Sequence, residues 1–205
     1  MNDTETKNTA VKAPALMSTR PVTAQDALDQ CEKLSPMMVH YCQTKTGLTD
    51  PANTILFYRL GDFYEMFFED ATLVSKELEL TLTGKDCGME DRAPMCGIPY
   101  HAAEGYINRL VENGHKVAIC EQMEDPKQAK GMVKREVIRV VTPGTTLIPQ
   151  GLDETKNNYI MSIVCMEGCF GISTADISTG QCLVTEMDKP RRLVDEITKF
   201  MPAEI

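Results

Sequence analysis

The chain has 205 residues, of which 42% are hydrophobic and 25% are charged, and its formal net charge is −9 at pH 7. That size allows one full hydrophobic core and part of a second. No apolar run approaches the roughly 20 residues that cross a bilayer, and the N-terminal stretch lacks the apolar segment of a signal peptide, so we expect a cytoplasmic protein with no membrane partner. The net negative charge argues against a simple nucleic-acid binder, because the neutralisation of DNA phosphates by basic side chains supplies most of the affinity for DNA.

The chain contains eight cysteines without a C-x-x-C pair, and Cys165 and Cys169 are spaced C-x-x-x-C. Without a secretion signal, reduced thiols are a better interpretation than disulfides. Three histidines are far apart in sequence, so a zinc site is possible but has no support. They are His40, His101 and His115.

The N-terminal part of the chain predicts a tail followed by two helices. Residues 1–21 contain few large apolar side chains, which predicts disorder. Apolar residues from Thr23 onward predict a helix that ends at Ser35-Pro36. A second helix is predicted over residues 36–46, with proline in its first turn and Gly47 just past its end.

Two apolar and aromatic runs follow, residues 54–60 and 63–68, separated by Gly61-Asp62. This pattern predicts a β-hairpin with a tight turn. In an extended run Phe63 and Glu65 share one face, roughly 7 Å apart, whereas Tyr64 points to the other face. A flat ring and a hydrogen-bonding group could therefore contact the same flat ligand. The pattern alone favours a core phenylalanine beside a solvated edge glutamate.

Helices and strands alternate after the hairpin, which predicts a mixed α/β domain over residues 22–143. Asp70 is expected to be the N-cap of the first helix, and the last two strands are expected to have buried aliphatic centres. The predicted elements are a helix at 71–79, a short strand at 80–83, a loop at 84–92, a strand at 95–98, a helix at 102–113, and strands at 116–122 and 136–141.

A proline- and glycine-containing stretch predicts a linker over residues 144–157. Beyond it, residues 158–205 predict three strands and a helix, the start of a second domain. These elements are expected at 159–165, 170–177, 181–186 and 190–200.

Five motifs in this order strongly resemble the bacterial MutS family of DNA mismatch-repair proteins. They are SPMM (35–38), FYRLGDFYE (57–65), APMCGIPYH (93–101), VAICEQ (117–122) and RVVTPGT (139–145). The family's proteins are far longer, so the resemblance implies an N-terminal fragment. It implies an α/β mismatch-recognition domain with a mixed sheet flanked by helices, followed by part of a ribonuclease-H-like connector domain.

The resemblance also implies the partners, which are mismatched duplex DNA, a second MutS subunit and a MutL-like protein. An acidic domain could read a base if other parts of the molecule hold the DNA backbone. ATP and Mg²⁺ are expected in the full-length protein. The fragment has no GxxxxGK[ST] motif, so we expect no cofactor, no metal site, no catalytic residue and no enzymatic activity within it.

The family's Phe-x-Glu motif corresponds to Phe63 and Glu65. By resemblance, Phe63 enters the duplex at the defect and stacks on a mispaired or unpaired base, and Glu65 hydrogen-bonds that base. Lys134 and Arg135 are assigned to phosphate contact, in a basic stretch that also holds Lys127 and Lys130. A solvated charge run is the competing interpretation.

Met95 and His101 belong to a segment that contacts the groove in the family, although some relatives carry arginine where this chain has His101. A purely structural loop is the alternative for both residues.

The sequence is compatible with two other functions. A magnesium-dependent nuclease could use carboxylates near the hairpin or Asp176, although helix capping explains Glu69 and Asp70 better. A protein-interaction module would instead have Phe63 packed in its core.

Overall fold

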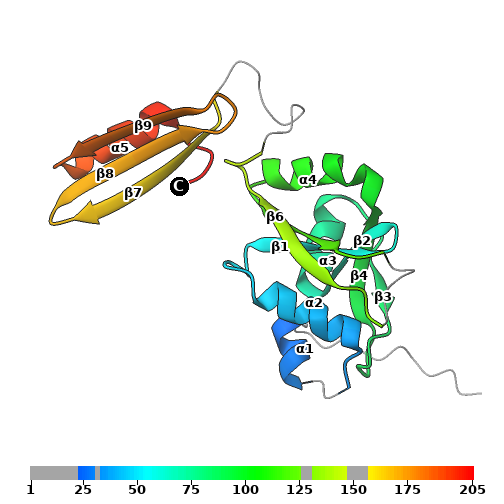
Figure 1. Ribbon diagram of the computed structural model, residues 1–205. Coiled ribbons are helices and arrows are strands. Elements are labelled where there is room, and N and C mark those ends of the chain that lie inside the picture. The colour runs from blue at the N-terminus through cyan, green and yellow to red at the C-terminus, as the bar shows by residue number, and fades with distance from the viewer. Residues whose placement is uncertain (1–22, 31–32, 126–130, 147–156) are drawn as a thin grey trace, which may run out of the picture.

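The structure, a computed structural model, describes residues 23–30, 33–125, 131–146 and 157–205 (Figure 1). The predicted tail over residues 1–21 lies outside these ranges, as do most of the predicted linker, Lys127 and Lys130. The described residues form a mixed six-stranded sheet with helices and a separate three-stranded antiparallel sheet, so the α/β fold class is confirmed.

The larger sheet has the strand order β3-β4-β2-β1-β5-β6. Strands β1 and β5 are parallel, and all other neighbours are antiparallel. The bounds are β1 (Thr54–Leu60), β2 (Phe63–Phe67), β3 (Thr83–Lys85), β4 (Ala93–Pro99), β5 (Lys116–Gln122) and β6 (Arg135–Val141).

The predicted hairpin is confirmed, since β1 and β2 pair with Leu60 opposite Phe63. Gly61 has a φ of +57°, a left-handed conformation that glycine adopts without a Cβ clash. The turn at Gly61 therefore determines that β2 begins at Phe63.

Alternate residues of β1 enter two different cores. Ile55 and Phe57 pack with α3 (Phe68–Glu77) and α4 (Ala103–Glu112) on one face of the sheet. Leu56 and Tyr58 pack with α1 (Ala24–Gln30) and α2 (Pro36–Thr46) on the other face. Burial on both faces explains why the β1 sequence is apolar without alternation.

The helix after the hairpin begins earlier than predicted, and Asp70 does not cap it. Helix α3 starts at Phe68, and its N-cap position provides no side-chain hydrogen bond. Glu69 instead accepts a hydrogen bond from the backbone N–H of Ala24, in the first turn of α1.

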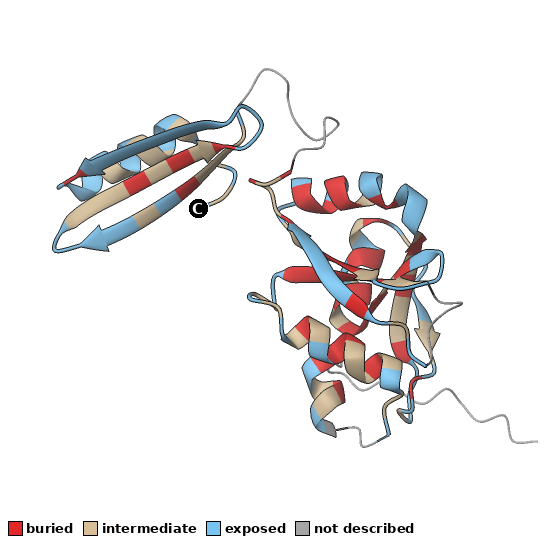
Figure 2. Cartoon of the chain, viewed as in Figure 1, coloured by how far each residue is buried: buried red, intermediate tan, exposed pale blue. Residues whose placement is uncertain are grey.

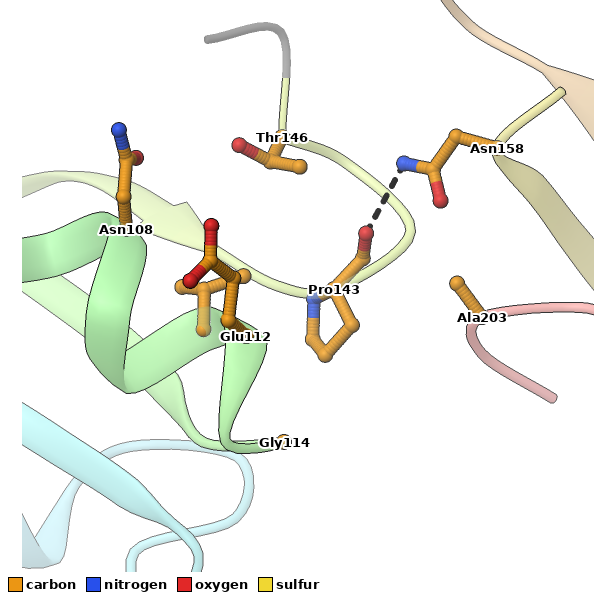
Figure 3. Close-up of a pocket in the computed structure, with 8 residues that line it drawn as sticks. Asn108, Glu112, Gly114, Pro143, Thr146, Asn158 and Ala203 are labelled. Atoms are coloured by element: carbon orange, nitrogen blue, oxygen red, sulfur yellow. Dashed lines mark hydrogen bonds between the residues drawn. The ribbon is translucent and has the colours of Figure 1, made fainter. Parts of the chain in front are cut away.

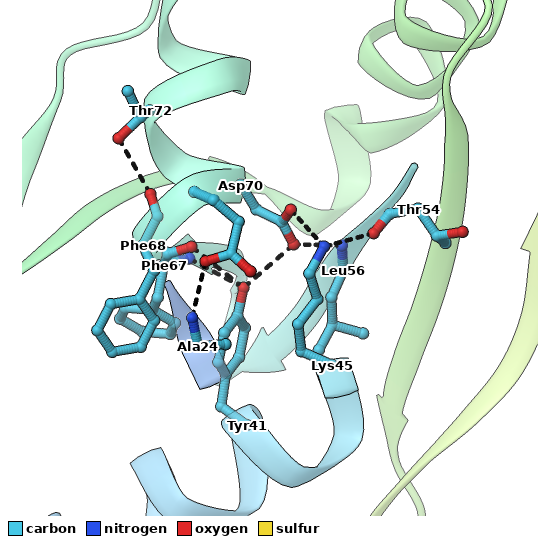
Figure 4. A network of polar contacts seen from close by, with 10 residues as sticks. Ala24, Tyr41, Lys45, Thr54, Leu56, Phe67, Phe68, Asp70 and Thr72 are labelled. Carbon is cyan, nitrogen blue, oxygen red and sulfur yellow. Dashed lines mark hydrogen bonds and ion pairs between the residues drawn. The ribbon is translucent and has the colours of Figure 1, made fainter. Parts of the chain in front are cut away.

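Asp70 is buried at the centre of a polar network (Figure 4). Its Oδ1 lies 2.6 Å from Lys45 Nζ, and its Oδ2 accepts from the Leu56 N–H at 2.8 Å and from the Tyr41 hydroxyl at 3.4 Å. Burial raises the pKa of Asp70 to about 6, although the Lys45 ammonium and the Leu56 N–H act in the opposite direction. The carboxylate thus connects α3, α2 and β1.

Two strand predictions need correction. The strand expected at 80–83 is β3, which covers residues 83–85 and pairs with residues 93–95 of β4. The buried aliphatic centre expected for β6 is wrong. Val137, Ile138 and Val140 are exposed because β6 forms an edge of the sheet (Figure 2).

The smaller sheet has the order β7-β8-β9, with α5 packed against it. Its core contains Met161, Ile172 and Met187, packed by Leu193 and Phe200. The bounds are β7 (Tyr159–Met166), β8 (Cys169–Asp176), β9 (Gln181–Met187) and α5 (Pro190–Phe200). The seven cysteines of the described ranges are free thiols, and no helix in these ranges is long and apolar enough to cross a membrane.

Candidate nucleic-acid interface

Phe63 is exposed at the start of β2, directly after the hairpin turn. Its exposed fraction is 46%, whereas Phe67 on the same face of β2 is fully buried. Phe67 makes an edge-to-face contact with Tyr41 of α2 at 4.8 Å between ring centroids. The interpretation of Phe63 as a core residue is therefore wrong. The interaction-module hypothesis required this ring to be packed in the core, so that form of the hypothesis is wrong as well.

The turn before Phe63 is held by two hydrogen bonds. The Arg59 Nε donates to the Gly61 carbonyl at 2.6 Å, and the Tyr100 N–H donates to the Asp62 carbonyl at 3.0 Å. The Arg59 guanidinium also lies 3.6 Å from the centroid of the Tyr100 ring. The exposed ring is thus attached to a backbone fixed by Arg59 of β1 and by Tyr100, the residue that follows β4.

Glu65 lies on the same face of β2 as Phe63, and its carboxylate is paired. Its Oε2 is 2.6 Å from Nζ of Lys85, at the end of β3. Sequence reasoning missed Lys85, which is twenty residues away and falls within a predicted polar loop. Only the strand order, in which β4 separates β2 from β3, brings the two side chains together.

Tyr64 points to the opposite face, as the alternation predicts. It is buried, and its hydroxyl donates to the Glu121 carboxylate of β5. Burial and this hydrogen bond raise the pKa of Tyr64 to about 12. The prediction that Tyr64 lies on the opposite face is confirmed, and Phe63 and Glu65 are the residues of β2 that could face a ligand.

The two predicted phosphate-contacting residues differ in their surroundings. Lys134 is exposed and forms an ion pair with Glu136 at 2.6 Å, which raises the pKa of Lys134. Arg135 is only 8% exposed, and it donates to the carbonyls of Arg59 and Val133 at 2.7 and 2.8 Å. In contrast to the predicted phosphate contact, Arg135 connects β6 to β1.

Met95 and His101 are also in different positions. Met95 lies on β4 opposite Phe67 and packs against the core beneath α1 and α2. His101 is exposed in the short 3₁₀-helix η1 (Tyr100–Ala102), which directly follows the Pro99 that pairs with Phe63. The structure therefore brings η1, with His101, to the exposed end of the hairpin and places Met95 further into the sheet.

Two family models match consecutive parts of the chain. The model described as MutS domain I matches residues 35–149, and the model described as MutS domain II matches residues 158–205. This chain belongs to the MutS family. Phe63, Glu65 and Lys85 all lie within the part matched to MutS domain I.

Curated relatives agree with this assignment. The chain is 65% identical over 173 residues to the DNA mismatch repair protein MutS of Lachnoclostridium phytofermentans, covering 84% of this chain and 18% of that protein. It is 56% identical over 175 residues to the protein of the same name from Acetivibrio thermocellus, covering 84% and 20%. The chain thus spans about a fifth of the length of the curated relatives that it matches.

The carboxylates that suggested a nuclease have separate partners in this MutS chain. Glu65 pairs with Lys85, and Asp70 pairs with Lys45. Asp176, at the end of β8, accepts from the Ser178 N–H and hydroxyl at 2.9 and 2.6 Å, and these bonds lower its pKa. Within the described ranges, no three His, Cys, Asp or Glu side chains are grouped as a metal would require. The nuclease hypothesis gains no support.

A cavity of about 340 Å³ lies away from the hairpin, between α4 and the segments that flank residues 147–156 (Figure 3). The Asn158 side chain donates to the Pro143 carbonyl there at 2.9 Å. Residues from both the part matched to MutS domain I and the part matched to MutS domain II line the cavity. None of the candidate interface residues lines it.

Proposed function

We propose that this chain is the N-terminal part of a DNA mismatch-repair protein, and that it recognises mispaired or unpaired bases in duplex DNA. In this proposal Phe63 inserts as a wedge and Glu65 hydrogen-bonds the base. The observation that carries the proposal is the half-exposed Phe63 ring on a fixed turn, with a carboxylate two residues away on the same face. A ring with no role outside the fold would gain free energy from burial, as Phe67 does.

The wedge detects an error through the deformability of the duplex. Inserting an apolar side chain between base pairs unstacks a step and costs a few kcal/mol. A mismatched step has already lost pairing and stacking free energy, so it kinks at a lower cost. Stacking of the Phe63 ring on the base recovers about 1–3 kcal/mol. The difference in binding free energy between the mismatched and the matched duplex therefore does not depend on base sequence.

Glu65 adds discrimination to the affinity that Phe63 supplies. A carboxylate near DNA phosphates is repelled, which penalises ordinary duplex. At a defect the same carboxylate accepts a hydrogen bond from a base N–H that has lost its pairing partner, and bonds to charged groups are the stronger ones. Glu65 therefore favours the mismatch more than it favours DNA in general.

The rest of the protein supplies what this acidic chain lacks. A net charge of −9 predicts weak binding by these residues alone, so the backbone contacts come from elsewhere in a full-length protein, from a second MutS subunit and from exposed cations such as Lys134. ATP and Mg²⁺ bind to that remaining part, which carries the ATPase and engages a MutL-like partner. The fragment itself has no enzymatic role.

The domain limits are part of the same proposal. Residues 22–143 form the mismatch-recognition domain, 144–157 the linker, and 158–205 the start of a connector domain with a ribonuclease-H-like fold. Support for the last assignment comes from three antiparallel strands followed by a helix packed on one face.

The test compares Phe63→Ala and Glu65→Ala in the full-length protein. Fluorescence anisotropy at one fixed salt concentration measures affinity for a duplex with one G·T mismatch and for the matched duplex. Phe63→Ala should abolish the preference for the mismatch, and Glu65→Ala should reduce the preference more than the total affinity.

Leu73→Ala is the matched control, since Leu73 is also exposed but lies on α3, on the other face of the sheet. It should change neither affinity. An equal mismatch preference in wild type, Phe63→Ala and Glu65→Ala would remove the assignment.

A further inference from the structure

Lys85 is positioned against Glu65 by elements that the Phe-x-Glu motif does not include. Strand β3 has three residues, and it pairs with β4 at the edge of the sheet. From there the Lys85 side chain crosses β4 to reach Glu65 Oε2 at 2.6 Å, and its ammonium lies 5.5 Å from the centroid of the Phe67 ring. A cation at this distance from a ring face is attracted by the π-system. Two contacts therefore hold the ammonium in place.

Gly97 of β4 pairs with Glu65 across the strands. A Cβ at this position would lie 3.3 Å from the Tyr64 carbonyl oxygen and in ordinary contact with Glu65 Cγ at 3.5 Å. The pair is also partly shielded, because the side chains of Lys85 and Glu65 are 32% and 17% exposed. Partial shielding strengthens the electrostatic interaction relative to a pair in open water.

The pairing changes what Glu65 presents to a duplex. An unpaired carboxylate would add a negative charge beside the phosphates, whereas the Glu65–Lys85 pair has no net charge. Lys85 contacts Oε2, and none of the hydrogen bonds within the described ranges uses Oε1. One oxygen is thus held by the ammonium while the other remains an acceptor.

We infer that Lys85 is the counter-ion that allows Glu65 to approach DNA, and that it orients the carboxylate toward the base. The inference rests on the function proposed above and adds a positioning residue to it. Lys85 stays on Oε2 and reduces the repulsion from the phosphates, so the penalty on ordinary duplex is smaller than for a bare carboxylate, and Oε1 accepts from the base N–H. Lys85 acts through Glu65, so its importance depends on the charge of residue 65.

A double-mutant cycle in the full-length protein tests this dependence. Lys85→Met should lower the affinity for the G·T duplex by about tenfold, because it leaves a bare carboxylate near phosphates. In the Glu65→Gln background the same change should cost about twofold, the effect of losing one ordinary cation near DNA. Lys85→Arg keeps the charge and should remain within about twofold of wild type.

Lys134→Met provides the comparison with a cation that acts on phosphates directly, and it should lower the affinity equally in both backgrounds. Circular dichroism checks that the variants keep the wild-type thermal midpoint. The inference is overturned if Lys85→Met has no effect or has the same effect with glutamate and with glutamine at residue 65. Failure of the proposed function is distinguishable, since it appears as a mismatch preference that survives Phe63→Ala.

Discussion

Lys45→Met should destabilise the fold strongly at neutral pH and about half as much in mild acid. The ammonium and the Asp70 carboxylate are 2.6 Å apart, and their side chains are only 3% and 4% exposed. Removing one partner of a buried pair leaves an uncompensated charge, which typically costs about 3–5 kcal/mol. Asp70 keeps its bonds to Leu56 and Tyr41, so we expect about 3 kcal/mol at pH 7.

The pH dependence follows from the raised pKa. In the wild type, the pKa of Asp70 is about 6 in the folded state against an ordinary value of 3.8. Between these values the folded state binds a proton that the unfolded state does not, so this group's stabilising contribution is lost as the pH rises through about 6. Without the Lys45 ammonium the pKa rises further, and the loss with rising pH becomes larger. Near pH 5 Asp70 is mostly protonated in both proteins, so the destabilisation should fall by up to about 1.4 kcal/mol, to about 1.6 kcal/mol.

Urea unfolding of the 205-residue chain, followed by circular dichroism at pH 5 and pH 7, measures both values. Lys116→Met is the control, because its pair with Asp50 at 3.5 Å is about one-third exposed on both sides, and such pairs contribute about 0–1 kcal/mol. An equal loss of stability at the two pH values, or a loss no greater than that of Lys116→Met, would refute the reasoning.

The other predictions concern the turn and the two neighbouring cations. Gly61→Ala should lower the free energy of unfolding by about 1–2 kcal/mol, since residue 61 has a φ of +57°, and a urea titration with an unchanged midpoint would contradict this. Arg135→Met should destabilise the chain by about 1–3 kcal/mol, because it removes hydrogen bonds to two carbonyls, while leaving the salt dependence of DNA binding unchanged. Lys134→Met should leave the stability unchanged and reduce the slope of log affinity against log salt concentration by about one. If Arg135→Met reduced this slope and Lys134→Met did not, the phosphate contact would belong to Arg135.

The sequence by itself determined the local features of this protein. The Gly61-Asp62 interruption predicted the hairpin, and the alternation along β2 placed Tyr64 on the face opposite to Phe63. These features depend on neighbouring residues alone, through the backbone freedom of glycine and the two-residue repeat of a strand. The ordered motifs also predicted the MutS family, which the comparisons confirm.

The tertiary structure decided which of these residues are exposed and which are paired. Phe63 and Phe67 share a face and a residue type, yet only Phe67 lies beneath α2. Lys85 reaches Glu65, and Lys45 reaches Asp70, across twenty and twenty-five residues of chain. Burial and ion pairing depend on which distant elements become neighbours, and a local sequence pattern does not determine this. The surroundings of Phe63 and Glu65 therefore followed only from the order of strands in the sheet and the position of the helices on it.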